Sequence, residues 1–387
     1  MSTPAPVFLT GASGFIGGKI TERLLAEGRR VRVLARRPLP HLEKLGAEVI
    51  LGDLDDTVAL RRGCADAGTV FHVAGRVGVW GPAEEFFRVN LEGTRHLVAA
   101  CQTTGVPRLV YTSSPSVVYR GGDLSGVNES APLCTQAPCA YPTSKAAAER
   151  LVRAANSPDL ATIALRPHLV WGPGDKNVIP RVLTLARQGR LKIIGSGHNR
   201  VDCTHITNVV DAHLLAEQAL FTAAAGGVPA PRGGTNGTFH VLRETSTTPA
   251  PAGQELVNPP FHELLDSALG RHEEPRAPGG KAYFITNGEP VVLWDWINQL
   301  LRGLALPEIQ KHVSLRTAYL AGSAMEMLWR LLPLKGEPPM TRFVAKEMAT
   351  DHWFDLTAAR RDLGYNPRVT MAAGTAELIE HLKGGIL

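Results

Sequence analysis

The sequence predicts an α/β protein with a doubly wound parallel sheet and a smaller, mostly helical C-terminal lobe. Two observations predict this class. From residue 6 to about 220, apolar runs of strand length alternate with stretches of helical periodicity, which is the pattern of parallel strands joined by covering helices. A glycine-rich turn also follows the first apolar run directly and opens the first helical stretch.

The expected strands of the sheet are short apolar segments in the first 170 residues. They are residues 7–10, 31–35, 48–52, 69–74, 108–113 and 162–166. Between the first two, Ile16, Ile20 and Leu24 recur at helical spacing, and Gly28 ends that helix. The chain therefore begins as strand, turn, helix and strand.

The sequence predicts that the whole chain divides into three parts. Residues 1–222 form the nucleotide-binding domain with the catalytic residues, 223–279 form an irregular Pro- and Gly-rich excursion, and 280–387 form a substrate-binding lobe. The lobe opens with a strand at 281–286 and a helix near Val291. Residues 314–334 are rich in Leu, Ala, Met, Tyr and Trp but also carry charges, so the helix they predict covers an apolar pocket, lies on a membrane surface or packs in the core.

Composition excludes several classes of protein. Hydrophobic residues make up 44% and charged residues 20% of the 387, the proportions of a globular protein, and no apolar run is long enough to span a membrane. The net charge of +5 comes from scattered basic pairs with no aromatic-interleaved stripe, so we expect a nucleotide phosphate as the anionic partner and no nucleic acid. The start of the chain lacks a signal peptide pattern, and the five cysteines lack zinc-site spacing; we therefore expect a cytoplasmic protein with reduced thiols and no metal.

The glycine-rich turn predicts a site for a dinucleotide pyrophosphate. Gly11, Gly14 and Gly17 stand at every third position, which permits a tight turn, a close approach of the phosphates and packing of the helix on the strand. The helix that follows presents its unpaired amides to the anion. We expect Ser13, and Phe15-Ile16 in the first helical turn, to contact the cofactor here. The fold is therefore Rossmann-type.

Residues after the next strands predict which cofactor binds. An NAD site usually has a carboxylate after the second strand, whereas this chain has Arg36 and Arg37, whose guanidinium groups can pair with a 2′-phosphate. The sequence thus favours NADP(H), with NAD(H) as the alternative if both arginines are only solvated. Asp53-Leu54 is placed to contact the adenine, and Ala74-Gly75 to pass beneath the pyrophosphate and the nicotinamide ribose.

A tyrosine and a lysine four residues apart predict the proton donor. Tyr141 and Lys145 fall on one face of a helix, where the cation together with an oxidised nicotinamide lowers the pKa of the phenol from about 10 toward neutrality. Ser114, at the end of the fifth strand, is the donor that orients the substrate oxygen. Ser113 is its alternative, and a helix cap is the structural interpretation of either serine.

These motifs occur in the order and spacing of a known superfamily. The segments are the glycine turn, Asp53-Leu54, Asn90 in Asn-Leu-Glu-Gly-Thr, Tyr-Thr-Ser-Ser at 111–114, the Tyr141 and Lys145 pair, and Leu165-Arg166-Pro167. The chain resembles the extended short-chain dehydrogenase/reductase superfamily over nearly its whole length. Segments 170–175, 201–213, 284–290 and 364–367 resemble its 3β-hydroxysteroid dehydrogenase branch. The resemblance implies that Asn90 and Pro167 contact the cofactor and that the protein is a homodimer.

The resemblance implies an enzyme of lipid metabolism that interconverts 3-oxo and 3-hydroxy groups on a bulky hydrophobic substrate. Segments 112–117, 186–190 and 336–339 resemble reductases of 2-alkyl-3-oxoalkanoates. The alternatives are a sterol-4-carboxylate 3-dehydrogenase, a sugar-nucleotide epimerase, and a non-catalytic NADP-binding protein with a sensing or scaffold role. The excursion at 223–279 is longer than the family pattern predicts. The apolar helix at 314–334 adds a lid over long alkyl chains or a peripheral membrane contact to the expectations.

Overall fold

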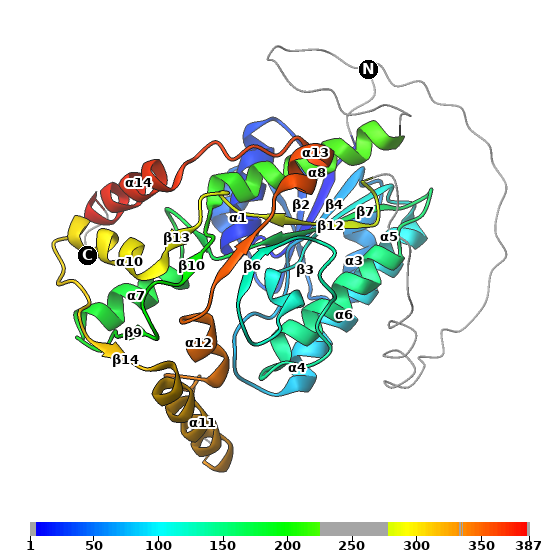
Figure 1. Ribbon diagram of the computed structural model, residues 1–387. Helices are drawn as coiled ribbons and strands as arrows, with labels where there is room; N and C mark the ends of the chain where they lie inside the picture. The colour runs from blue at the N-terminus through cyan, green and yellow to red at the C-terminus, as the bar shows by residue number, and fades with distance from the viewer. Residues whose placement is uncertain (1–4, 225–277, 333, 335, 385–387) are drawn as a thin grey trace.

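A seven-stranded parallel sheet forms the centre of the protein (Figure 1). The computed structural model describes residues 5–224, 278–332, 334 and 336–384. The strand order is β12-β7-β5-β4-β1-β2-β3, so the order reverses between β1 and β4. Ligands bind at such a reversal, beyond the carboxyl ends of the strands. The strands are β1 (Val7–Thr10), β2 (Val31–Ala35), β3 (Glu48–Leu51), β4 (Thr69–His72), β5 (Arg108–Thr112), β7 (Ala161–Pro167) and β12 (Lys281–Ile285).

Helices cover both faces of the sheet, which confirms the doubly wound fold. One face carries α1 (Phe15–Ala26), α2 (Pro40–Lys44), α8 (Ile206–Ala224) and α13 (Thr357–Leu363). The other carries α3 (Thr57–Cys64), α4 (Ala83–Phe87), the π-helical η1 (Arg88–Glu92), α5 (Gly93–Thr104) and α6 (Ala140–Ala154), and the 3-10 turn η2 (Pro115–Val118) follows β5. Each face buries its own apolar core.

A second layer is assembled from segments far apart in the chain. Its four-stranded sheet is β13 (Val291–Val292), β10 (Arg200–Val201), β15 (His352–Phe354) and β6 (Leu124–Val127). Two small pairs, β8 (Val170–Trp171) with β11 (Thr204–His205) and β9 (Ile193–Ile194) with β14 (His312–Val313), adjoin it. Its helices are α7 (Val178–Arg187), α10 (Leu293–Gly303), α11 (Leu315–Leu331), α12 (Arg342–Glu347) and α14 (Met371–Gly384), over a core that includes Trp171, Trp294 and Trp296.

The division of the chain differs from the expected one. β12 is an edge strand of the large sheet, paired parallel with β7 from Lys281 to Ile285, and α13 packs on α8 and β12. The expected boundary at 280 assigned both elements to the lobe, because a single strand and a short helix carry no local signal of the sheet they join. Most of the expected excursion lies outside the described residues.

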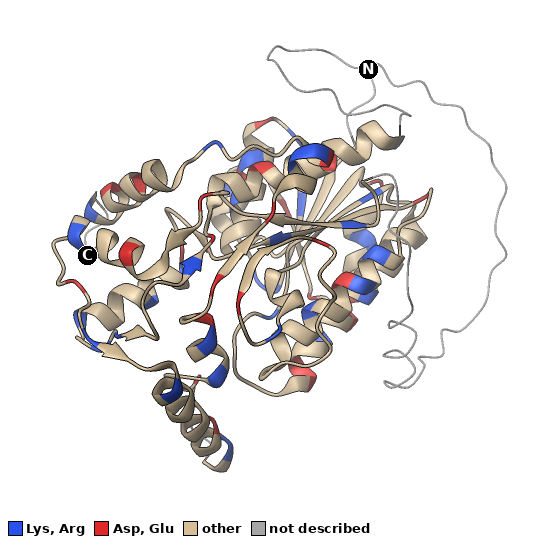
Figure 2. Cartoon of the chain, viewed as in Figure 1, with Lys and Arg blue, Asp and Glu red and all other residues tan. Residues whose placement is uncertain are grey.

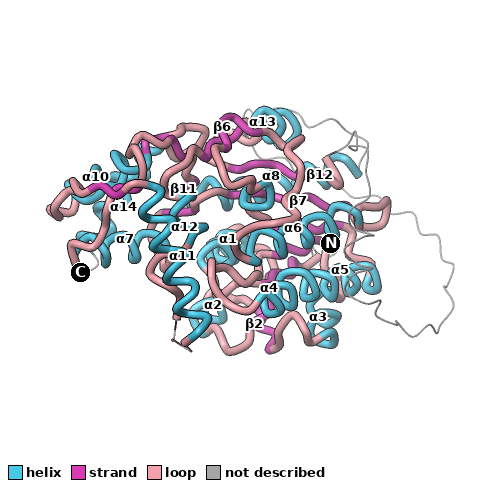
Figure 3. The backbone as a smooth tube through the Cα atoms, turned by 60° about the horizontal axis from the view of Figure 1, so that its bottom comes forward, coloured by secondary structure: helices cyan, strands magenta, loops and turns pink. Residues whose placement is uncertain are grey.

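The helix expected at 314–334 is α11, and its placement corrects one expectation. Its N-terminus is capped by Ser314, whose hydroxyl accepts a hydrogen bond from the Thr317 amide at 3.0 Å. Only Ala318, Gly322 and Glu326 are buried; Ala318, with Leu315 and Tyr319 beside it, packs on the core of the second layer, whereas most of the large apolar residues from Met327 onward are exposed, so the core-packing alternative holds only for the start of the helix. Figure 3 shows α11 beside α12, and Figure 1 shows α11 away from the central sheet. Over the residues described, no helix has the length and apolar character needed to cross a bilayer.

A buried ion pair joins α6 to the sheet. Arg166 on β7 donates to Glu149 on α6 through Nε (2.9 Å to Oε2) and Nη2 (2.6 Å to Oε1), and both side chains are fully buried. Ser113 donates to the same carboxylate at 2.6 Å. The pKa of Glu149 is lowered, because Arg166 and these hydrogen bonds outweigh the burial that would raise it. The carboxylate therefore stays charged inside the fold.

Removing one partner of this pair should destabilise the fold strongly. Glu149→Ala leaves Arg166 charged and buried, so we expect the free energy of unfolding to fall by about 3–5 kcal/mol in a denaturant titration. The control is Glu27→Ala, which breaks the exposed pair with Arg23 and should cost less than about 1 kcal/mol. Equal effects of the two variants would contradict the role given to the buried pair.

Candidate functional site

The turn between β1 and α1 has no room for side chains. Gly11 has a φ of +86°, and a Cβ there would lie 2.6 Å from the Ala74 amide nitrogen at the end of β4. A Cβ on Gly17 would lie 2.3 Å from the Gly11 carbonyl oxygen. Gly14 caps α1 and donates its amide to Gly11 at 3.0 Å, with no side-chain cap on the helix. The first amides of α1 are thus available to an anion, which fits a pyrophosphate.

The other predicted residues of the turn lie around these glycines. Ser13 is exposed, whereas Phe15 and Ile16 are half-buried in the first turn of α1. Ile16 packs against the apolar core of its face of the sheet. Ser13 therefore offers an exposed side chain at the turn, whereas the side chain of Ile16 packs against the core.

The residues that follow β2 and β3 are the ones expected to bind the adenosine part of the cofactor. Arg36 and Arg37 follow β2, are both exposed, and make no ion pair with the described residues. Asp53, after β3, accepts a hydrogen bond from the Asp55 amide at 2.9 Å, which fixes the loop. Leu54 is buried beneath α5, where a Cβ on Gly93 would lie 2.7 Å from it. The arginine side chains are therefore free to meet a phosphate.

Asn90 fixes the loop that follows β4. Its Oδ1 accepts a hydrogen bond from the Arg76 amide at 2.7 Å, and its Nδ2 donates to the Arg76 carbonyl and to Ser144 Oγ on α6, each at 3.0 Å. A Cβ on Gly75 would lie 3.2 Å from Asn90 Oδ1 and 3.8 Å from Lys145 Nζ. Asn90 is buried, so it holds the Ala74-Gly75 segment in place rather than offering its own side chain to a ligand.

The structure brings Ser114 and Tyr141 together, and places Lys145 one turn along the same helix. The Ser114 side chain lies near enough to the Tyr141 phenol to lower its pKa, against the larger effect of burial. Ser114 also caps η2, accepting the Ser116 amide at 3.2 Å, so its functional and structural interpretations coexist. Ser113 instead donates to Glu149 in the core, which removes it from the catalytic side. Lys145 donates from Nζ to the Thr112 carbonyl at 2.7 Å.

The pKa values of the pair depend mainly on burial. Burial raises the pKa of Tyr141, and the interaction with Ser114 opposes this. Burial lowers the pKa of Lys145 to about 7, although Glu149 opposes that shift. The sequence predicts a lowered phenol pKa, whereas in the chain alone it is raised. The physical reason is that burial disfavours the phenolate, and the oxidised nicotinamide, one of the two predicted causes, is not part of the chain.

Sequence reasoning missed several buried polar contacts behind the site. Glu149 and Arg166 were not predicted to pair, although Glu149 lies one turn after Lys145 on the same helix face and Arg166 interrupts an apolar strand. Two histidines were also missed. His72 bonds Thr10 at 2.7 Å and Thr94 at 2.9 Å, and burial lowers its pKa to about 3. His213 bonds Thr112 at 2.7 Å, and burial lowers its pKa to about 4. Both rings are therefore neutral connectors between elements.

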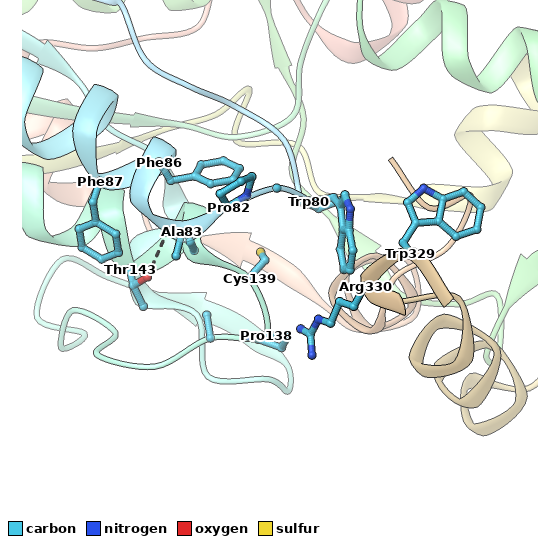
Figure 4. A pocket seen from close by; sticks show the side chains of 14 residues that line it. Trp80, Pro82, Ala83, Phe86, Phe87, Pro138, Cys139, Thr143, Trp329 and Arg330 are labelled. Carbon is cyan, nitrogen blue, oxygen red and sulfur yellow. Dashed lines mark hydrogen bonds between the residues drawn. The ribbon is translucent and has the colours of Figure 1, made fainter. Parts of the chain in front are cut away.

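An apolar pocket of about 600 Å³ opens beside the first turn of α6 (Figure 4). Ala83, Phe86 and Phe87 line one side, and Trp80, Trp329 and Arg330 line the other. Cys139, Ala140 and Thr143, at the start of α6, connect the two sides; Tyr141, between Ala140 and Thr143 in the chain, is not itself a lining residue. Pro167, predicted near the cofactor, is buried at the end of β7 opposite Ile285. Among the described residues, no three His, Cys, Asp or Glu side chains gather as a metal site.

Comparisons with known proteins give the following similarities. Residues 8–228 match the family described as the 3-beta hydroxysteroid dehydrogenase/isomerase family. A 2-alkyl-3-oxoalkanoate reductase of Stenotrophomonas maltophilia is 37% identical, covering 96% of this chain and 98% of the relative. A sterol-4-alpha-carboxylate 3-dehydrogenase, decarboxylating, of Mus musculus is 29% identical, covering 96% and 90%.

Solved structures share the fold. MoeE5 in complex with UDP-glucose and NAD is 25% identical with a TM-score of 0.63, over 98% of this chain and 99% of that one. The structure named gox2253 is 22% identical with a TM-score of 0.68, over 98% of each chain. The latter similarity concerns the fold alone.

A methyl group in the glycine turn should weaken cofactor binding. Gly17→Ala forces the turn away from α1, so we expect the Kd for NADPH, measured by fluorescence titration, to rise about tenfold or more. The control is Gly122→Ala, because no atom lies within 4 Å of a Cβ there. An unchanged Kd for a folded Gly17→Ala protein would show that the turn does not hold the pyrophosphate.

Proposed function

The chain belongs to the 3-beta hydroxysteroid dehydrogenase/isomerase family, and from this we propose that it reduces the 3-oxo group of a 2-alkyl-3-oxoalkanoate with NADPH. It is an oxidoreductase of 3-oxo or 3-hydroxy groups that uses NAD or NADP. The observation that carries the proposal is the interaction of Ser114 with Tyr141 in the first turn of α6, whose neighbours Ala140 and Thr143 line an apolar pocket, with the glycine turn at the same edge of the sheet.

The proposed mechanism divides one reduction among three side chains. The reduced nicotinamide, when bound, supplies the hydride that forms the new bond to C3. Ser114 donates a hydrogen bond to the substrate oxygen and orients it. Tyr141 donates its proton to that oxygen, so the carbonyl becomes an alcohol and the tyrosine becomes a phenolate. Lys145, while charged, stabilises the phenolate and contacts the cofactor ribose beside Gly75.

The remaining proposed cofactor contacts follow the carboxyl edge of the sheet. They comprise the turn residues Gly11, Ser13, Gly14, Phe15, Ile16 and Gly17, the adenine-side residues Arg36, Arg37, Asp53 and Leu54, and Ala74, Gly75 and Pro167. The proposal for these residues rests on their position, because the carboxyl ends of the parallel strands lie along one edge of the sheet. We propose that Asn90 acts through the loop it fixes rather than by direct contact.

The pocket supports the substrate class. Trp80, Phe87 and Trp329 offer an apolar surface of the kind that accepts alkyl chains, and Cys139 connects it to the first turn of α6. Because Trp329 lies at the end of α11, we propose that this helix acts as a lid and that the second layer, which includes α10, α12 and α14, supplies the substrate lobe. The exposed arginines after β2 favour NADPH and hence reduction. We further propose a homodimer through α5 and α6, which lie side by side on one face of the sheet.

Loss of the Tyr141 hydroxyl should abolish turnover and leave cofactor binding intact. With NADPH and 2-alkyl-3-oxoalkanoates of graded chain length, we expect Tyr141→Phe to lower kcat by about 10²–10⁴-fold, followed by cofactor absorbance. The control is Tyr283→Phe, which removes a hydroxyl bonded to Asp362 on the far side of β12. Faster turnover of a 3-hydroxysteroid or a sterol acid with NAD⁺ would support the sterol alternative. Unchanged turnover in Tyr141→Phe would refute the mechanism.

The arginines after β2 should decide the cofactor preference. In the double variant Arg36→Glu, Arg37→Glu, we expect the Kd for NADPH to rise about tenfold or more. The Kd for NADH should change little, because only NADPH carries the 2′-phosphate. Arg187→Glu with Arg190→Glu is the control of equal charge change at exposed positions of α7 and its end. A wild-type preference for NADH would overturn the assignment of NADPH.

A further inference from the structure

The outward face of α11 carries large apolar side chains in water. The exposed fractions are 60% for Leu320, 61% for Met327, 43% for Leu328 and 73% for Leu331, and the chain continues with Leu332 and Leu334, also exposed. Other exposed large apolar residues, such as Leu45, Leu51, Val58 and Phe221, stand singly on other elements. Scattered exposure is normal in a folded protein, whereas a concentration on one helix indicates a contact surface.

Helical geometry gathers these residues into one stripe. At roughly 100° per residue, Leu320, Met327 and Leu331 point in nearly the same direction, with Leu328 on one flank. Arg316 and Arg330, both exposed, fall on the opposite flank. Figure 2 shows the helix mostly uncharged, with basic positions near its two ends. The stripe is therefore apolar along its centre and basic along one border.

The acidic residue of this helix faces the protein. Glu326 is buried and pairs with Arg342 on α12 at 2.8 Å. Gly322 lies on the same inward side, where a Cβ would be 2.7 Å from the Thr341 backbone. The exposed side of α11 thus carries positive charge with no carboxylate to balance it.

We propose that α11 lies in the plane of an anionic lipid bilayer, with Leu320, Met327 and Leu331 among the acyl chains. The length of the helix, its apolar stripe and its lateral arginines are the features of interfacial helices. Arg316 then lies at the depth of the lipid phosphates, which supplies the charge complementarity. A second copy of this chain fits less well, because two such stripes would bring arginines against arginines.

The position of the pocket agrees with this placement. Trp329 and Arg330, on the same helix as the stripe, line the apolar pocket (Figure 4). A bilayer that contacts Met327 and Leu331 therefore lies next to the pocket. This consequence rests on the proposed function, since it gives a long-chain substrate a direct path from lipid. The docking of α11 itself does not depend on the reaction.

Vesicle flotation tests the docking independently of catalysis. The probes are vesicles of phosphatidylcholine with phosphatidylglycerol and vesicles of phosphatidylcholine alone, with the full chain carrying NADPH. We expect the wild-type protein to float with the anionic vesicles and less with the neutral ones, and high salt to release it. Failure of the wild-type protein to float with anionic vesicles would overturn the proposal, whether or not the protein reduces a 3-oxo acid.

Variants separate the stripe from general charge effects. Met327→Glu with Leu331→Glu should reduce vesicle binding about tenfold or more, because two carboxylates replace acyl contacts at a negative surface. Leu51→Glu with Val58→Glu, at similarly exposed positions on β3 and α3, makes the same charge change and should retain binding. Equal losses in both double variants would overturn the assignment to α11.

Two further measurements test the contribution of Arg316 and the alternative that a second copy of the chain covers the stripe. Arg316→Gln should weaken binding to anionic vesicles about fivefold and leave binding to neutral vesicles unchanged. Thermal unfolding and the Kd for NADPH verify that each variant is folded. Sedimentation velocity tests whether a second copy of the chain covers the stripe. If the double variant Met327→Glu, Leu331→Glu dissociates a dimer and leaves vesicle binding unaffected, the stripe is assigned to a second copy.

Discussion

The ion pair between Glu149 and Arg166 sets the position of the catalytic helix on the sheet. Both side chains are fully buried, and the carboxylate also accepts a hydrogen bond from Ser113. A buried charge is tolerated when its partner and further hydrogen bonds satisfy it, and it becomes costly when either is lost. These contacts therefore oppose any rotation or sliding of α6 against β5 and β7.

The position of the catalytic side chains follows from this pair. Ser113, just after β5, bonds to Glu149, and the next residue, Ser114, interacts with Tyr141 two turns earlier on the same helix. Lys145, one turn before Glu149, reaches the Thr112 carbonyl from the same helix face. The site thus depends on a charge that no substrate touches.

A turn built on glycines and an apolar pocket complete the site. No side chain fits at Gly11 or Gly17 of the turn, and little room is left at Gly75. A Cβ at Gly11 or Gly17 would overlap the backbone, and a Cβ at Gly75 would lie close to Asn90. The pocket beside α6 is shaped by apolar surface, contributed by the segment around Trp80 and by the end of α11. α11 leaves most of its apolar surface outside the fold, because only its narrow side meets α12. Its exposed stripe is thus available to contacts outside the chain.

The sequence by itself determined the parallel sheet, its first six strands and the glycine turn, because strand and helix periodicity and the need for missing side chains are local properties. The tertiary structure alone decided that β12 joins the large sheet, that Ser114 rather than Ser113 meets Tyr141, and that α11 is a surface helix. It also paired Glu149 with Arg166, which are 17 residues apart on different elements. Such outcomes depend on which surfaces meet after the elements form, and periodicity along the chain carries no record of that choice.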